Sequence, residues 1–115
     1  MILTSVGTEQ QALEISEELV ARSLATCINI LPCLRSIYRW KGKICTDSEY
    51  VLLIKTRRSL FEAVSKAIRE LHSYELPEIL ALPVEVADRA FHEWVLRMVD
   101  PAEDEAEDGE NPDYD

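Results

Sequence analysis

The sequence lacks the features that mark membrane, secreted and disulfide-linked proteins. Its longest apolar run near a predicted strand, residues 51–54, is far shorter than the roughly 20 residues of a membrane helix. The opening stretch, MILTSVGTEQ, contains neither a basic region nor a long apolar segment, so we expect no secretory signal and a cytoplasmic protein. The cysteines Cys27, Cys33 and Cys45 are odd in number and form no CxxC pair. We therefore predict free thiols and no membrane partner.

Motifs of several enzyme classes are also absent. The sequence has no GxxxxGK phosphate-binding loop, no HExxH zinc motif and no nucleophile elbow. Glu75 and Glu78 form a close carboxylate pair within HSYELPEIL, but Pro77 between them prevents both from sharing a helical face. A basic face of the kind that binds nucleic acid is missing too. We expect no catalysis and no binding to DNA or RNA.

The composition indicates one domain followed by an acidic tail. The chain has 115 residues, of which 47% are apolar, and this suits one compact core. Of the 22 acidic residues, nine lie in residues 100–115, which contain no base, while the first 99 residues carry the other 13 acids against 12 Lys and Arg. We therefore predict a nearly neutral domain over residues 1–99 and a disordered acidic tail over residues 100–115.

The predicted strands are short β-prone runs bounded by turn residues. They cover residues 1–6, 25–31, two arms of a hairpin within 36–56, and 78–86. Pro32 is expected to close the second strand, because proline cannot donate a hydrogen bond to a central ladder. Gly42, after Lys41, is expected to form the hairpin turn, and residues 46–48 a bulge or bend.

Three helices are predicted from apolar residues spaced three and four apart. The first follows Thr8 and Gln11, which have the spacing of a capping box, and runs from near Glu9 to near Leu24. A second capping box, formed by Ser59 and Glu62, opens a helix that ends at residue 71. A short final helix follows Asp88 as its N-cap.

The order of these elements predicts an α+β protein with the ferredoxin-like βαββαβ sandwich, a long β-hairpin and a C-terminal helix. In this fold the helices cover one face of an antiparallel sheet. Apolar strands with open edges invite pairing with another chain, so we expect a closed homo-oligomer.

Four motifs in this order give a resemblance to a known family. They are A-x-C-x-N-I-x-P at residues 25–32, Y-x-W-x-G-K-I at 38–44, E-x-x-L-x-x-K-T at 49–56 and H-x-Y-x-x-P-E-I at 72–79. Together they resemble the CutA family of divalent-cation tolerance proteins, over residues 3–99. The resemblance implies a homotrimer with strands paired across subunits, a non-enzymatic role in binding and tolerance of copper and other divalent metals, and a shape similar to the PII signalling proteins. It implies no required cofactor.

The resemblance also suggests metal ligands, although the pattern is incomplete. In some bacterial members copper is assigned to a cysteine in the first strand and to a pair of histidines, whereas here Ser5 and Leu71 stand near those positions and only His72 remains. We therefore take Cys27, His72 and Glu78 as candidate ligands, since thiolate, imidazole and carboxylate suit copper or zinc. A trimer seam is expected to bring them together. In the alternative, Cys27 is a packed strand thiol and His72 is favoured at a helix C-terminus by the helix dipole.

Four more residues are candidates for a ligand-binding cleft between subunits. Lys55, in a strand, should have a partner, and Glu78 or Tyr74 is the expected one. Trp40, near the hairpin tip, is expected to pack into the next subunit. Glu49, from the third motif, completes the set. The alternative function is a PII-like signalling module that uses this cleft for a small anion or a partner peptide.

Overall fold

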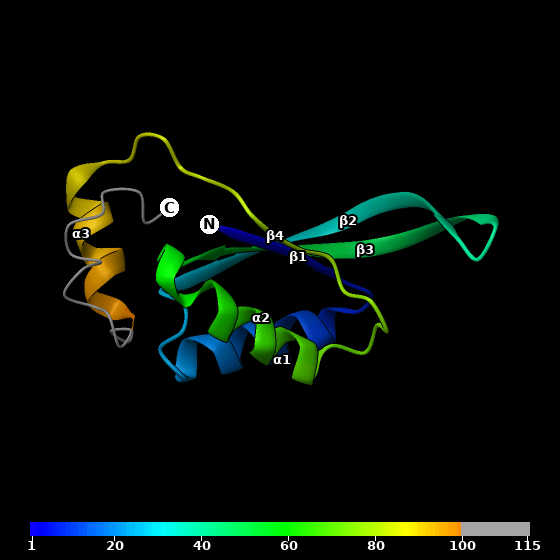
Figure 1. The fold of residues 1–115 in the computed structure, drawn as a ribbon, viewed down its shortest axis with the longest axis horizontal. Coiled ribbons are helices and arrows are strands. Elements are labelled where there is room, and N and C mark those ends of the chain that lie inside the picture. The colour runs from blue at the N-terminus through cyan, green and yellow to red at the C-terminus, as the bar shows by residue number, and fades with distance from the viewer. Residues whose placement is uncertain (100–115) are drawn as a thin grey trace.

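The computed structural model describes residues 1–99, in which two helices lie on the same side of a four-stranded antiparallel sheet (Figure 1). The elements are β1 Ile2–Val6, α1 Glu9–Ala21, β2 Cys27–Trp40, β3 Lys43–Lys55, a 3₁₀ turn Arg58–Leu60, α2 Phe61–Leu71, β4 Ile79–Ala81 and α3 Arg89–Met98. The strand order β2-β3-β1-β4 confirms the predicted ferredoxin-like fold. The predicted tail, residues 100–115, lies outside the described residues.

The core lies between the sheet and helices α1 and α2. Ile15 and Leu19 of α1, Ile68 of α2 and Leu52 and Ile54 of β3 are fully buried there. Leu52 and Ile54 are two residues apart, so both side chains point to the helical face of the sheet. No helix within residues 1–99 is long and apolar enough to cross a membrane.

The β2–β3 hairpin extends well beyond the helices and gives the chain a length of 46 Å (Figure 1). The prediction that Pro32 ends the second strand is wrong, because the strand continues to Trp40 after a register shift between Leu31 and Leu34. Within that bulge Cys33 has a φ of 63°. β2 is an edge strand, so a proline can be accommodated at a bulge without breaking a central ladder.

Of the two other predictions for the hairpin, one is confirmed and one is wrong. The predicted turn is confirmed, since Lys41 and Gly42 have φ values of 51° and 82°, as a two-residue hairpin loop requires. The predicted bulge at residues 46–48 is wrong, because these residues pair in regular register with residues 35–37. The bulge lies in β2 instead, which has one extra residue between Leu31 and Leu34.

The predicted cap of the first helix is confirmed in part. The Thr8 hydroxyl accepts a hydrogen bond from the Gln11 N–H at 3.1 Å. The Gln11 side chain does not complete a capping box with Thr8, and instead donates to the Leu71 carbonyl at the end of α2, at 3.2 Å. α1 ends at Ala21, earlier than predicted, and Ser23 then has a φ of 59°.

The other two caps differ from each other. Asp88 caps α3 as predicted, accepting from the Phe91 N–H at 3.0 Å. The Ser59 cap is wrong, because the 3₁₀ turn precedes α2 and no side chain caps the helix. The last strand is also shorter than predicted, since only β4 pairs with β1 and residues 82–88 form no strand.

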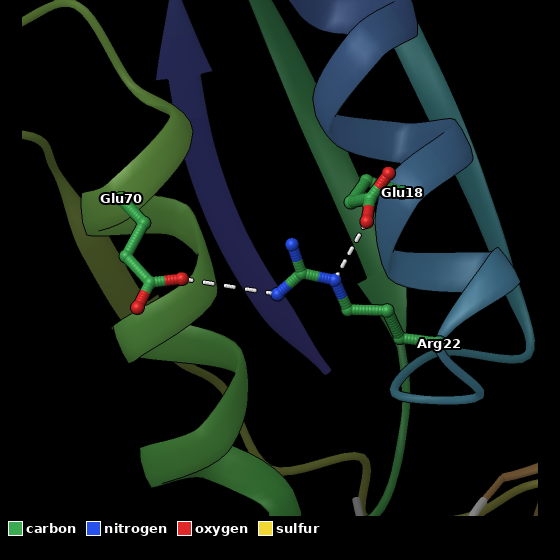
Figure 2. Close-up of polar contacts among 3 residues, drawn as sticks. All are labelled: Glu18, Arg22 and Glu70. Atoms are coloured by element: carbon green, nitrogen blue, oxygen red, sulfur yellow. Dashed lines mark hydrogen bonds and ion pairs between the residues drawn. The ribbon is translucent and has the colours of Figure 1, made fainter.

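One arginine connects the two helices on their exposed side. The Arg22 Nε lies 2.7 Å from Glu18 Oε2 on α1, and its Nη1 lies 3.8 Å from Glu70 Oε1 on α2 (Figure 2). Exposed ion pairs of this kind contribute about 0–1 kcal/mol each. Core packing therefore holds the helices together.

α3 lies at the end of the molecule away from the hairpin tip (Figure 1). Its Val95 is buried, and the Val95 carbonyl accepts a hydrogen bond from the Thr26 hydroxyl at 2.8 Å. Phe91, Trp94 and Met98 on the same helix stay more than a third exposed. α3 is thus attached to the domain at Val95 and at Val99, which directly follows the helix and is buried in the core.

Candidate functional site

An open cleft of about 810 Å³ lies between the outer half of the β2–β3 hairpin and the segment that joins α2 to β4. The hairpin contributes side chains from alternate positions, which therefore point to one face of the strands. These are Ser36, Tyr38 and Trp40 of β2 and Asp47 and Glu49 of β3, and Ile37 of β2 also borders the cleft. The joining segment contributes residues 73–76 and Glu78, and β1 contributes Ser5.

Glu49 is the most buried carboxylate of the cleft, with only 5% of its surface exposed. The Ser36 hydroxyl donates to one of its oxygens at 2.5 Å and the Tyr74 hydroxyl to the other at 2.7 Å. Both donors are neutral, and no ion pair to Glu49 is formed within residues 1–99. Burial, together with the hydrogen bond to the Glu49 carboxylate, raises the pKa of Tyr74.

A second tyrosine–carboxylate pair lies nearer the hairpin tip. The Tyr38 hydroxyl of β2 donates to Asp47 Oδ2 of β3. This hydrogen bond is the main reason that the pKa of Tyr38 is raised to about 12. The hairpin thus carries two carboxylates, each bound by a phenol.

His72 lies behind the cleft wall and is 9% exposed. Its Nδ1 accepts a hydrogen bond from the Tyr74 N–H at 3.0 Å, so the ring proton belongs on Nε2, which lies 2.6 Å from the Ser5 carbonyl oxygen. The rings of His72 and Tyr74 also contact each other, with centroids 4.6 Å apart. His72 therefore connects β1 to the joining segment.

The residues around Ser5 continue the sheet where β4 has ended. The last β1–β4 pair is Thr4 with Ile79, and the next two residues along, Ser5 and Glu78, are joined by their side chains at 3.2 Å. The Ser5 hydroxyl is the donor to Glu78 Oε1. Glu78 is thus fixed at the cleft wall by a neutral donor, as Glu49 is.

The cleft is acidic. Four carboxylates line it, those of Asp47, Glu49, Glu75 and Glu78, and no lysine, arginine or histidine lines it among the described residues. The Tyr38, Tyr74 and Trp40 rings also line it, together with three serines and the apolar residues Ile37 and Leu76. Such a surface attracts cations and repels anions.

Comparison with known proteins assigns the family. The model of the CutA1 divalent ion tolerance protein family matches residues 1–98. The chain belongs to the CutA1 family. This confirms the resemblance drawn from the four sequence motifs.

Several relatives of this CutA1 chain have names that agree. It is 42% identical over 96 residues to human Protein CutA, covering 84% of this chain and 54% of that protein. It is 40% identical over 95 residues to the divalent-cation tolerance protein CutA of Thermus thermophilus, covering 83% of this chain and 92% of that protein. The CutA1 chain therefore spans about half the length of the human relative and nearly all of the bacterial one.

Solved structures show the same fold. The Thermus thermophilus CutA1 structure matches with a TM-score of 0.84 and 38% identity, covering 86% of this chain and 96% of that one. CutA1 from Oryza sativa matches with a TM-score of 0.86 and 32% identity over 88% and 93% of the two chains. The PII-like protein CutA from Nostoc matches with a TM-score of 0.80 and 31% identity over 86% and 95%.

The predicted site residues of this CutA1 chain fall into two groups. Trp40, Glu49, Tyr74 and Glu78 line the cleft, and His72 lies directly behind it. Cys27 lies elsewhere: it pairs with Lys55, six residues along β3 from Glu49, or roughly 20 Å at the usual strand rise. One chain thus brings two of the three predicted metal ligands near each other, and no metal-binding group of three ligands forms within residues 1–99.

Lys55 does not line the cleft either, and the prediction of its partner is wrong. Its ammonium donates to the Asn29 side-chain oxygen on β2, not to Glu78 or Tyr74. This contact lies at the end of the hairpin far from its tip, where Cys27 pairs with Lys55. The neutral amide is sufficient because the lysine is only half-buried.

Sequence reasoning missed the partners that give the cleft its shape. These are Ser5, Ser36, Tyr38 and Asp47. Once the two arms are known to pair, positions 36, 38 and 40 and positions 47 and 49 fall on one face, because alternate strand residues share a face. The sequence itself carries no clear signal of this, since polar residues also stand at positions 35, 39, 46 and 48. The contribution of Ser5 had no signal either, since it depends on the position at which β4 ends.

Proposed function

We propose that this CutA1 chain is a non-enzymatic, cytoplasmic homotrimer that binds a divalent cation in the acidic cleft and so contributes to metal tolerance. The observation that carries the proposal is the cleft lining, which contains four carboxylates and, among the described residues, no basic side chain. Two of them, Glu49 and Glu78, are oriented by hydroxyl donors that leave their negative charge uncompensated. A bound cation would supply that compensation.

The ligand chemistry favours oxygen donors over the copper set. Carboxylates and hydroxyls suit Mn²⁺ and other hard divalent cations, and Zn²⁺ also accepts carboxylate. A copper site built on Cys27, His72 and Glu78 would require a thiolate from a neighbouring chain and the loss of a His72 hydrogen bond. We therefore place the cation near Glu49 and Glu78, with further ligands from another subunit, because residues 1–99 of one chain form no group of three metal ligands.

The shape of the chain supports assembly. β2 is an edge strand of 14 residues with one side unpaired, and Ile37 on it is 72% exposed. Residues 82–88 form no strand in this chain and carry the exposed apolar side chains Leu82 and Val86. Strand pairing between subunits would cover both the free edge of β2 and the segment 82–88. Open strand edges are normally covered or protected in native proteins. Light scattering tests this, and a monomer at micromolar concentration would contradict the trimer.

Calorimetry on chelator-treated protein tests the cation site. Glu49→Gln and Glu78→Gln should each weaken Mn²⁺ or Zn²⁺ binding at least about tenfold, because even partners outside the ligand shell typically contribute that much. Glu93→Gln is the matched control, since Glu93 is exposed on α3 and away from the cleft lining. All three variants keep the acidic residues 100–115, so diffuse attraction of cations to these residues is the same in each and does not affect the comparison. Equal affinity in all variants would contradict the proposal.

A second candidate is a PII-like ligand-binding module whose ligand is an organic cation. The specific observation is that the aromatic rings of Tyr38, Tyr74 and Trp40 line the same acidic cleft. Ring faces and carboxylates together favour amines and guanidinium groups. The small anion first considered is disfavoured, because Lys55 does not reach the cleft. Thermal shifts with amines, anions and metal salts separate the candidates, since a ligand of the native state raises the midpoint.

A further inference from the structure

We infer that His72 is a positioning residue that fixes two carboxylates of the cleft, and that it is not itself a metal ligand. A histidine beside a cation-binding cleft is ordinarily a candidate ligand. Here the contacts of both ring nitrogens oppose that role. The inference deepens the proposed cation site, although its first measurement requires no cation.

The ring of His72 has no lone pair free for a metal. A neutral imidazole has one nitrogen lone pair available to accept, and in His72 that lone pair, on Nδ1, accepts from the Tyr74 N–H at 3.0 Å. The other nitrogen, Nε2, carries the proton and donates to the Ser5 carbonyl at 2.6 Å. Metal binding at either nitrogen would break one of these hydrogen bonds, and the ring is nine-tenths buried.

The two hydrogen bonds of His72 lead to the two oriented carboxylates. On one side, Tyr74 uses its N–H for His72 and its hydroxyl for Glu49. On the other, Ser5 uses its carbonyl for His72 and its hydroxyl for Glu78. One imidazole thus holds the backbone of two of the three residues that orient the carboxylates, while Ser36 reaches Glu49 independently of it.

The turn that carries His72 is also held from α1. The Gln11 amide donates to the Leu71 carbonyl at 3.2 Å, and its oxygen accepts from the Ser73 N–H and hydroxyl at 3.3 and 2.9 Å. The residues on both sides of His72 are therefore fixed to the same helix. This leaves the imidazole little freedom to turn toward the cleft.

The first test is the protonation state of the ring, measured by ¹⁵N NMR of the full-length protein with and without saturating ¹¹³Cd²⁺. We expect His72 to show a protonated Nε2 and an unprotonated Nδ1, unchanged by cadmium. His92→Gln removes the only other histidine signal and assigns the spectrum. A cadmium coupling on either His72 nitrogen, or the opposite tautomer, would overturn the inference.

The second test compares His72→Ala with His72→Asn, because the Asn side-chain oxygen lies where Nδ1 does and can accept from the N–H two residues later. His72→Ala should weaken Cd²⁺ binding about ten- to a hundredfold, as loss of an orienting partner does, and should speed exchange of the Tyr74 amide proton. His72→Asn should restore the protection of the Tyr74 amide and part of the affinity, because its oxygen replaces the Nδ1 acceptor while no atom of Asn reaches the Ser5 carbonyl as Nε2 does. If Asn protects the Tyr74 amide and affinity still stays as low as in Ala, the Tyr74 contact of His72 does not position the site and the inference is wrong.

The two proposals fail separately. If the wild-type protein binds none of Mn²⁺, Zn²⁺ and Cd²⁺, the cation site is wrong, while the ring tautomer and the Tyr74 amide exchange still decide the positioning role of His72. If Cd²⁺ binds and shifts the His72 ring nitrogens to metal-bound values, the cation site stands and the positioning role is refuted.

Discussion

Replacing Gly7 by alanine should destabilise the wild-type protein but stabilise the variant that lacks the Tyr74 hydroxyl. A Cβ at Gly7 would lie 3.0 Å from the Tyr74 oxygen, while the next nearest ring atoms are 3.7 Å away. The hydroxyl cannot move aside freely, because it donates to Glu49 at 2.7 Å. The clash therefore depends on one atom, which Tyr74→Phe deletes.

The magnitudes follow from these contacts. Gly7 is not among the residues with positive φ, so alanine should gain about 0.4–1 kcal/mol by restricting the unfolded chain. With Tyr74 present, this gain is offset by stretching a hydrogen bond to a carboxylate, a type of bond that contributes about 1.5–3 kcal/mol. We expect Gly7→Ala to destabilise the wild type by about 0.5–2.5 kcal/mol and to stabilise Tyr74→Phe by about 0.4–1 kcal/mol.

Urea unfolding of the four proteins at one fixed concentration measures the cycle, because association shifts apparent stability. Tyr38→Phe is the matched control, since its hydroxyl bonds Asp47 and is absent from the surroundings of Gly7. Gly7→Ala should have the same effect in that background as in the wild type. Additivity with Tyr74→Phe to within about 0.5 kcal/mol would refute the reasoning, since independent sites add to that precision.

Three other changes have expected outcomes. The raised pKa of Tyr74 adds stability that is complete below the unfolded pKa of about 10 and is lost as pH rises above it, so Tyr74→Phe should show a shallower loss in alkaline unfolding curves. An unchanged slope would contradict this. Cys33→Gly should stabilise by about 1 kcal/mol in urea, because Cys33 has a left-handed φ of 63°, and destabilisation would refute it. Thr26→Val removes the hydrogen bond to Val95, so it should cost about 1 kcal/mol and speed amide exchange in α3, whereas unaltered exchange would show that α3 is anchored otherwise.

The fold could be predicted because its signals are local. Thr8 and Asp88 cap helices through contacts within three residues, and the period of apolar residues fixes which face of each helix is buried. The rules that failed depend on the structure next to the residue to which they are applied. Pro32 would end a central strand but not an edge strand, and Ser59 would cap a helix only if no 3₁₀ turn preceded it.

The cleft could be predicted less well because its contacts join distant parts of the chain. The Ser5–Glu78 bond joins residues 73 positions apart, and the Tyr74–Glu49 bond joins residues 25 apart. Sequence motifs placed Trp40, Glu49, Tyr74 and Glu78 in the cleft, but no spacing rule shows that hydroxyls would hold the carboxylates. Within one chain Cys27 lies far along the sheet from the cleft, and its meeting with His72 across a trimer seam stays a prediction.

The choice of neutral partners for Glu49 bears directly on the proposed function. An arginine beside this buried carboxylate would cancel its charge and favour folding of the empty protein, because a buried charge is costly unless paired. Hydroxyl donors from Ser36 and Tyr74 satisfy the oxygens but leave the charge in place. The empty cleft is therefore less stable than it would be with an arginine, and a cation that enters it gains the attraction that such a base would have cancelled. On this reasoning, adding the cation should raise the resistance of the wild-type protein to unfolding as the cation binds. Glu49→Gln should lose both the binding and this stabilisation.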